Sequence, residues 1–160
     1  MAIQVGDALP RVETLTQLVD GRKAPIAVED LFAGKRVVLF AVPGAFTPTC
    51  SGKHLPGFVA QADAILARGV DAIVCIATND AYVMDAWGRA HGARRIRMIG
   101  DGNGDFTRAL GLEKDGREGG MGIRSQRYAL IAEDGIVHGL FVERPGELEV
   151  SRAEAVLARL

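Results

Sequence analysis

The sequence predicts an α/β fold of three layers, in which helices cover both faces of a mixed central sheet. Two unbroken apolar runs, residues 37–42 and 72–77, are typical of strands that are buried on both faces. Helical patterns follow both runs, and such alternation favours parallel strands joined by right-handed crossovers. Near the end of the chain, Glu133-Asp134-Gly135 separates two more apolar runs and predicts an antiparallel hairpin.

Composition limits the classes of protein to consider. A chain of 160 residues with 48% hydrophobic and 24% charged residues indicates one globular domain, spanning residues 1–160. A net charge of −1 gives no electrostatic reason to expect nucleic acid or a membrane surface as a partner. Two cysteines are too few for a disulfide scaffold, and the first residues lack the features of a signal peptide, so we expect a cytoplasmic location.

Turn and capping signals predict the remaining elements. Pro56 is expected to kink or break the helix that follows Cys50. Ser151 and Glu154 match a capping box and predict the start of a last helix. The other expected elements are a strand within 12–19 that ends at Asp20-Gly21, a helical turn at 29–32, helices at 57–68, 81–91 and 105–110, a strand at 96–99, a mobile loop at 114–122 and the hairpin strands 128–132 and 136–142.

The candidate functional stretch begins where the first buried strand ends. Pro43 and Gly44 stop that strand, and Thr47 followed by Pro48 is typical of a helix start with Thr47 as the N-cap. Cys50 is then expected in the first helical turn, among free backbone N–H groups. A helix N-terminus favours the thiolate, which is the nucleophilic form of cysteine. The alternative is that Cys50 is an inert buried side chain, as most lone cysteines are.

The same residues resemble a known family. The sequence PGAFTPTCS, residues 43–51, is similar to the Pro-x-x-x-Thr-x-x-Cys motif of the peroxiredoxins, in the form found in the type II, or peroxiredoxin-5-like, branch. The resemblance continues through HLPGF at 54–58, RSQRYAL at 124–130 and EDGIVHGLFVE at 133–143. It spans nearly the whole chain. It implies a thioredoxin-like fold and a peroxidase of hydrogen peroxide and alkyl hydroperoxides that uses no metal or organic cofactor.

The resemblance also implies a role for each site residue. Cys50 would attack the peroxide and become a sulfenic acid. Thr47 would contact the peroxide, and Pro43 would shield the sulfur from water. Arg127 matches the active-site arginine of the family, although spacing alone favours a surface charge. Its cation would stabilise the thiolate and hold a peroxide oxygen.

Two further residues are expected to support the site. Gly44 would allow the backbone to approach the substrate closely. Arg124 is the second arginine of the run at 124–130, and it would support the site or its loop. A purely structural role for Arg124 remains open.

Cys75 raises the question of how the oxidised cysteine is reduced. It lies in the middle of the buried run 72–77, which favours an inert core thiol, but it could instead resolve the sulfenic acid after local unfolding. No cysteine follows Cys75, so a resolving cysteine near the C-terminus is excluded. We therefore expect glutathione or glutaredoxin as the reductant, with thioredoxin as the alternative. The resemblance also implies a homodimer.

His54 and the fold leave two other function classes open. His54 follows Cys50 by four residues and suggests a metal pair or a Cys–His dyad, but two ligands do not make a zinc site, and a packing or capping histidine is favoured. A dyad would instead indicate a cysteine hydrolase or acyltransferase. A non-catalytic redox-sensing or chaperone-like protein on the same fold is the other alternative.

Overall fold

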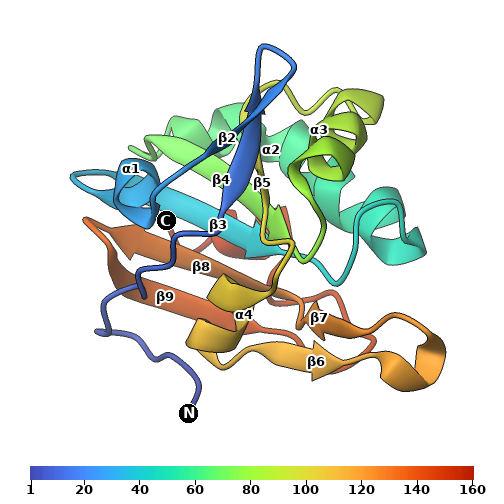
Figure 1. Ribbon diagram of the computed structural model, residues 1–160. Coiled ribbons are helices and arrows are strands. Elements are labelled where there is room, and N and C mark those ends of the chain that lie inside the picture. The colour runs from blue at the N-terminus through green and yellow to red at the C-terminus, as the bar shows by residue number, and fades with distance from the viewer.

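Strands and helices alternate through the middle of the chain in the computed structural model, which describes residues 1–160 (Figure 1). The strands are β1 (Thr16–Val19), β2 (Arg22–Pro25), β3 (Arg36–Ala41), β4 (Ala72–Ala77), β5 (Ile96–Gly100), β6 (Glu113–Asp115), β7 (Ile123–Ser125), β8 (Tyr128–Glu133) and β9 (Ile136–Val142). The helices are α1 (Val28–Phe32), α2 (Leu55–Leu66), α3 (Ala81–Ala90), α4 (Asp105–Leu110) and α5 (Ala153–Leu157). A π-helical turn, η1 (Cys50–His54), precedes α2, and a 3-10 turn, η2 (Arg117–Gly119), follows β6.

Seven strands form the central sheet, in the order β2-β1-β5-β4-β3-β8-β9. The two apolar runs are neighbouring parallel strands, β3 and β4, and β5 extends the parallel part. The hairpin of β8 and β9 pairs with β3 in the antiparallel direction. The predicted mixed sheet is therefore confirmed. Strand β3 lies between β4 and β8, inside the sheet, because a strand with apolar side chains on both faces is stable only where other elements bury both faces.

Two hydrophobic cores flank the sheet, which confirms the three layers. On one side, α2, α3 and α5 pack through residues such as Phe58, Trp87 and Val156. On the other side, α1 and α4 pack through residues such as Phe32 and Phe106, and Figure 1 shows both of these helices on the near face. None of the helices combines the length and apolar character that crossing a membrane requires.

The register between β3 and β8 brings distant parts of the sequence together. Ala41, the last residue of β3, pairs with Tyr128, the first residue of β8. Because these strands are antiparallel, the segment that leaves β3 and the segment that enters β8 lie at the same edge of the sheet. The turn that begins at Pro43 is therefore placed beside Arg127.

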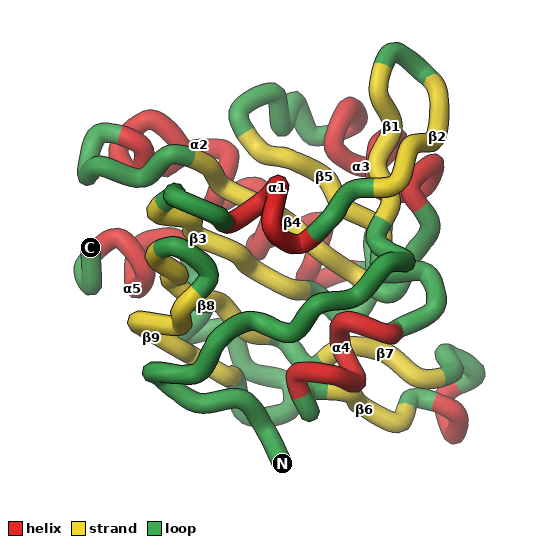
Figure 2. The backbone as a smooth tube through the Cα atoms, turned by 60° about the vertical axis from the view of Figure 1, so that its left-hand side comes forward, coloured by secondary structure: helices red, strands yellow, loops and turns green.

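The expected mobile loop at 114–122 is wrong in part. Strands β6 and β7 pair as a second, two-stranded sheet, in which Lys114 lies opposite Arg124. Figure 2 shows this ribbon beside α4, apart from the main sheet. Short strands with polar residues carry little hydrophobic periodicity, so the pairing leaves no clear pattern in the sequence. At the other end of the chain, the turn at Asp20-Gly21 is confirmed, and it joins β1 to β2, a strand that we did not predict.

The capping box expected for the last helix is also wrong. The helix is α5, its N-cap is Arg152, and no side chain caps it. The hydroxyl of Ser151 instead donates to the buried carboxylate of Glu143, at 2.7 Å. A charge-assisted hydrogen bond is stronger than a neutral one, so the hydroxyl of Ser151 bonds to Glu143 and does not cap the backbone N–H groups of α5.

Candidate active site

The segment after β3 turns sharply before a helix begins. Phe46 has a φ of 64°, a left-handed conformation that is uncommon for residues other than glycine. The N–H of Ser51 then donates to the carbonyl of Thr47 at 2.9 Å, which is the first helical hydrogen bond and places Thr47 at the expected N-cap position. The hydroxyl of Thr47, however, donates to the carbonyl of Gly44 at 2.6 Å and does not cap the helix.

The first turn of this helix is widened. Residues Cys50–His54 form a π-helical turn, in which the N–H of Leu55 donates to the carbonyl of Cys50. The break expected near Pro56 therefore takes the form of a wide turn followed directly by α2. Such turns occur frequently at functional sites. Cys50 lies in this turn with 1% of its surface exposed.

Arg127 connects the cysteine to a histidine. Its Nη2 donates to the sulfur of Cys50 at 3.1 Å, and its Nη1 lies 2.8 Å from Nδ1 of His54. A permanent cation in contact with sulfur stabilises the thiolate over the thiol. The planar guanidinium makes both contacts at once, which the single ammonium of a lysine does not reproduce.

His54 holds Arg127 in this position. Its Nε2 lies 3.0 Å from the carbonyl of Ser151, and since a carbonyl only accepts, Nε2 carries the proton and Nδ1 accepts from Arg127. Burial, reinforced by the charge of Arg127, lowers the pKa of His54 to about 4, so the ring is neutral near pH 7. The ring also packs against Phe40 and Phe58. His54 contacts Arg127 and makes no hydrogen bond with Cys50, so the structure provides no Cys–His dyad.

A buried carboxylate fixes the backbone that His54 contacts. One oxygen of Glu143 accepts hydrogen bonds from the N–H and the hydroxyl of Ser151 and from the N–H of Glu149. Burial alone would raise the pKa of Glu143, but these donors outweigh it and lower the pKa. Sequence analysis did not identify Glu143, Ser151 or the bond from His54 to Arg127 as parts of the site. The only available signal was that the family resemblance includes His54 and Glu143.

The buried histidine predicts a loss of stability in mild acid. The folded state binds the His54 proton only near pH 4, whereas the unfolded chain binds it near 6.5, so the unfolded state holds more protons between these values. The stabilisation is complete above about pH 6.5, falls as the pH drops through this window and amounts to roughly 3 kcal/mol at most. Urea unfolding at about pH 7 and about pH 4.5 measures the loss.

Two variants isolate this contribution from that of the carboxyl groups. In His54→Asn the side-chain carbonyl can still accept from Arg127 but cannot titrate, so this variant should lose less stability than the wild type on acidification. His138→Asn removes an exposed histidine and should behave as the wild type. The same acid loss in all three proteins would contradict the assignment to His54.

Gly44 and Arg124 lie side by side at the turn. A Cβ atom on Gly44 would meet Cγ2 of Thr47 at 3.2 Å and Nη1 of Arg124 at 3.3 Å, closer than side chains normally pack. The Nε of Arg124 donates to the carbonyl of Met121 at 2.7 Å. Arg124 therefore packs on the turn from the β6–β7 ribbon and makes no hydrogen bond with Cys50.

Cys75 lies on β4, opposite Phe40 of β3, and belongs to the same core as Cys50. Both cysteines are free. Burial raises the pKa of Cys75 well above its usual range, and the nearby Cys50 adds to this shift. A protonated thiol is a poor nucleophile, so this environment favours the core interpretation of Cys75, which stays a prediction.

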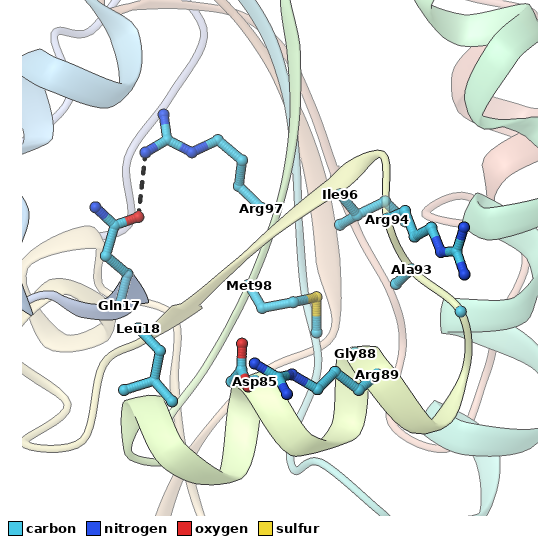
Figure 3. Close-up of a pocket in the computed structure, with 11 residues that line it drawn as sticks. Gln17, Leu18, Asp85, Gly88, Arg89, Ala93, Arg94, Ile96, Arg97 and Met98 are labelled. Atoms are coloured by element: carbon cyan, nitrogen blue, oxygen red, sulfur yellow. Dashed lines mark hydrogen bonds and ion pairs between the residues drawn. The ribbon is translucent and has the colours of Figure 1, made fainter. Parts of the chain in front are cut away.

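One cavity opens directly onto this group of residues. It has a volume of about 360 Å³, and Pro43, Thr49 and Arg127 form part of its wall. A second cavity, of about 520 Å³, lies between α3 and the start of β5 and contains none of the predicted site residues. There, Arg94 and Arg97 point away from each other (Figure 3), so they do not converge on a common ligand. The cavity at Arg127 is the one that the site can use.

Three comparisons place the chain among known proteins. The family model described as Redoxin matches residues 4–157. The chain is 49% identical to peroxiredoxin-2E-2, chloroplastic, of Oryza sativa subsp. japonica, over 99% of this chain and 72% of the relative. It is 43% identical to peroxiredoxin-2B of Arabidopsis thaliana, over 99% and 98%.

Solved structures agree with these relatives. The structure of reduced Prx3 from Vibrio vulnificus in complex with hydrogen peroxide matches with a TM-score of 0.94 and 52% identity, over 98% of each chain. Peroxiredoxin 5 from Alvinella pompejana matches with a TM-score of 0.81 and 34% identity, over 98% of this chain and 96% of the other.

Proposed function

The chain belongs to the redoxin family and is a peroxiredoxin, a thiol-dependent peroxidase with the thioredoxin-like fold, and from this premise we propose that Cys50 is its peroxidatic cysteine. One observation carries this assignment. Arg127 donates to the sulfur of Cys50 at 3.1 Å while a neutral, buried His54 holds the other arm of the guanidinium. A buried cysteine without a catalytic role has no need of a charged partner that is itself held in place.

The proposed first step is a displacement at oxygen. The Cys50 thiolate attacks the distal oxygen of the hydroperoxide, an S–O bond forms, and the O–O bond breaks. The sulfur loses two electrons to the peroxide. The distal oxygen stays on the sulfur, and the other oxygen leaves as water or an alcohol after taking up a proton. Cys50 becomes a sulfenic acid.

Four neighbouring residues assist this step in the proposal. Arg127 stabilises the negative charge that moves onto the leaving oxygen. The hydroxyl of Thr47 directs its hydrogen to the carbonyl of Gly44, so its oxygen is free to accept a hydrogen bond from the peroxide. Pro43 covers the approach to the sulfur, and Gly44 leaves room for the substrate.

An external thiol then reduces Cys50 in this proposal. A peroxiredoxin uses a thiol reductant, and we propose glutathione or glutaredoxin in preference to thioredoxin. The support is the burial of Cys75, which disfavours an internal disulfide as the product. We assign no catalytic role to Cys75.

The assembly and the location are also part of the proposal. We propose that residues 1–160 act as one domain and that two chains form a homodimer. The N–H of Ala45 donates to the side chain of Asn79, so the segments that carry Phe46 and Tyr82 are neighbours. Both aromatic side chains are exposed, and exposed apolar surface of this kind supports a dimer contact near the site. Two free thiols fit a reducing cytoplasm.

The intact mass of the reduced protein after one equivalent of hydrogen peroxide, with a sulfenic-acid trap, tests the assignment. A gain of one oxygen mapped to Cys50, followed by repeated turnover with an added thiol, is the expected result. Loss of two hydrogens with Cys50 linked to Cys75 would make Cys75 the resolving thiol. Oxidation without turnover by any thiol would indicate a redox sensor, and an unmodified Cys50 would refute the proposal.

A further inference from the structure

The cavity at Arg127 has a wall of polar and charged side chains. It is formed by the start of η1, the β6–β7 ribbon and the segment after β9. The charged residues that line it include Glu113, Lys114, Arg127, Arg144 and Glu147. A volume of about 360 Å³ is far more than a hydrogen peroxide molecule occupies, so the peroxide alone does not account for it.

Four of the charges on this wall have no partner within the protein. Lys114 and Arg144 are positive, Glu113 and Glu147 are negative, and all four are exposed. None of their side chains takes part in an ion pair or a hydrogen bond, in contrast to that of Arg117 on the same ribbon, which pairs with Asp115. The cavity therefore offers free groups of both signs next to the arginine that contacts Cys50.

We propose that this cavity is the binding site of the reducing thiol, and that the thiol is a small peptide-like molecule that carries carboxylates and an ammonium group. This inference rests on the proposed function. Lys114 and Arg144 would bind the carboxylates, and Glu113 or Glu147 would bind the ammonium. Free groups of both signs favour an occupant that itself carries both signs, because charge-assisted hydrogen bonds are stronger than neutral ones.

The chemistry at this site balances in two exchanges. The thiol sulfur attacks the sulfenic sulfur of Cys50, a mixed disulfide forms, and the hydroxyl leaves as water with the thiol proton. A second thiol then attacks the mixed disulfide, which releases the small-molecule disulfide and returns Cys50 to its reduced form. Two thiols are oxidised for each sulfenic acid reduced.

Charge reversal tests the site through the choice of thiol. The wild type and the double variant Lys114→Glu/Arg144→Glu are oxidised with one equivalent of hydrogen peroxide, and reduction is followed by the fluorescence of Trp87. This tryptophan reports on the site because its Nε1 donates to the hydroxyl of Ser51, next to Cys50, at 2.9 Å. The probes are glutathione, anionic mercaptoacetate, neutral 2-mercaptoethanol and cationic cysteamine.

The expected result is a change in preference rather than a general loss. In the double variant, the rates of reduction by glutathione and mercaptoacetate should fall about tenfold relative to the rate with 2-mercaptoethanol. The rate with cysteamine should rise relative to the same reference. Arg22→Glu/Lys23→Glu is the matched control, since it makes the same charge change on exposed residues of β2. That control should keep the wild-type order of thiols.

The proposal is overturned if the double variant keeps the wild-type order of thiols. This holds whether its rates are unchanged or fall equally with all four thiols, because in both cases the cavity does not select charge. Failure of the proposed function would look different from failure of the cavity proposal. In that case Cys50 of the wild type would not be oxidised by peroxide, or no thiol would reduce it after oxidation. Reduction by a protein dithiol alone would also reject the small-molecule site.

Discussion

Replacing Cys50 by serine is expected to abolish peroxide turnover, with a loss of at least about a thousandfold. A serine hydroxyl is a much poorer nucleophile than a cysteine sulfur, so the group that Arg127 contacts at 3.1 Å could no longer attack a peroxide. The fold should survive, because the two side chains differ little in size. Initial rates of hydrogen peroxide consumption with a thiol reductant in excess measure the loss, and circular dichroism checks the fold.

Cys75→Ala is the matched control for this prediction. It removes the other thiol of the chain from the same core and leaves every hydrogen bond of the site in place. We expect turnover with glutathione to stay within about threefold of the wild type, together with a modest loss of stability from the small cavity that the change creates. Residual peroxidase activity in Cys50→Ser, sensitive to the further loss of Cys75, would move the reactive sulfur to Cys75.

Arg127→Lys is expected to slow the oxidation of Cys50 by about a hundredfold. Lysine keeps the positive charge, but its single ammonium cannot contact the Cys50 sulfur and Nδ1 of His54 together, as the guanidinium does at 3.1 and 2.8 Å. A cation that is not held in place stabilises a developing charge less well. Stopped-flow oxidation, followed through Trp87, measures the rate of this step without the reductant.

Arg124→Lys provides the comparison at the second arginine. Arg124 makes one hydrogen bond, to the carbonyl of Met121, and does not contact the sulfur, so its replacement should slow oxidation by less than about tenfold. Equal losses in the two variants would contradict the proposal that the double contact of the Arg127 guanidinium, with Cys50 and His54, sets the rate of oxidation. A larger loss in Arg124→Lys would reverse the roles that we assign.

The sequence predicted those parts of the site that depend on neighbouring residues. Pro43, Thr47 and Cys50 lie within one turn and one helix start, and local rules for strand ends and N-caps place them. The position of Arg127 depends on the pairing of Ala41 with Tyr128, which joins segments far apart in the chain. Spacing therefore favoured a surface arginine, and only the family resemblance placed Arg127 at the site.

The residues around His54 show where local patterns fail. Ser151 and Glu154 have the spacing of a capping box, but the hydroxyl of Ser151 donates to the carboxylate of Glu143. A buried charge without hydrogen-bond donors costs more free energy than an uncapped helix end, whose N–H groups can bind water. In the same region, Pro56 indicated a break in the helix, whereas the structure has a wide turn at Cys50–His54 that continues directly into α2. There the ring of His54 packs against Phe40 and Phe58, which stack on each other. The capping box did not form because its serine has a partner on another segment of the chain.

The dependence of Arg127 on Ser151 has a consequence for the order of events during protein synthesis. Cys50 is made before the residues that hold His54 in place, Glu143 and Ser151, because they follow it in the sequence. A nascent chain therefore carries the cysteine before it carries the complete support for the cation. Arg127 can be held at the sulfur only after synthesis has passed Ser151 and that segment has folded against His54.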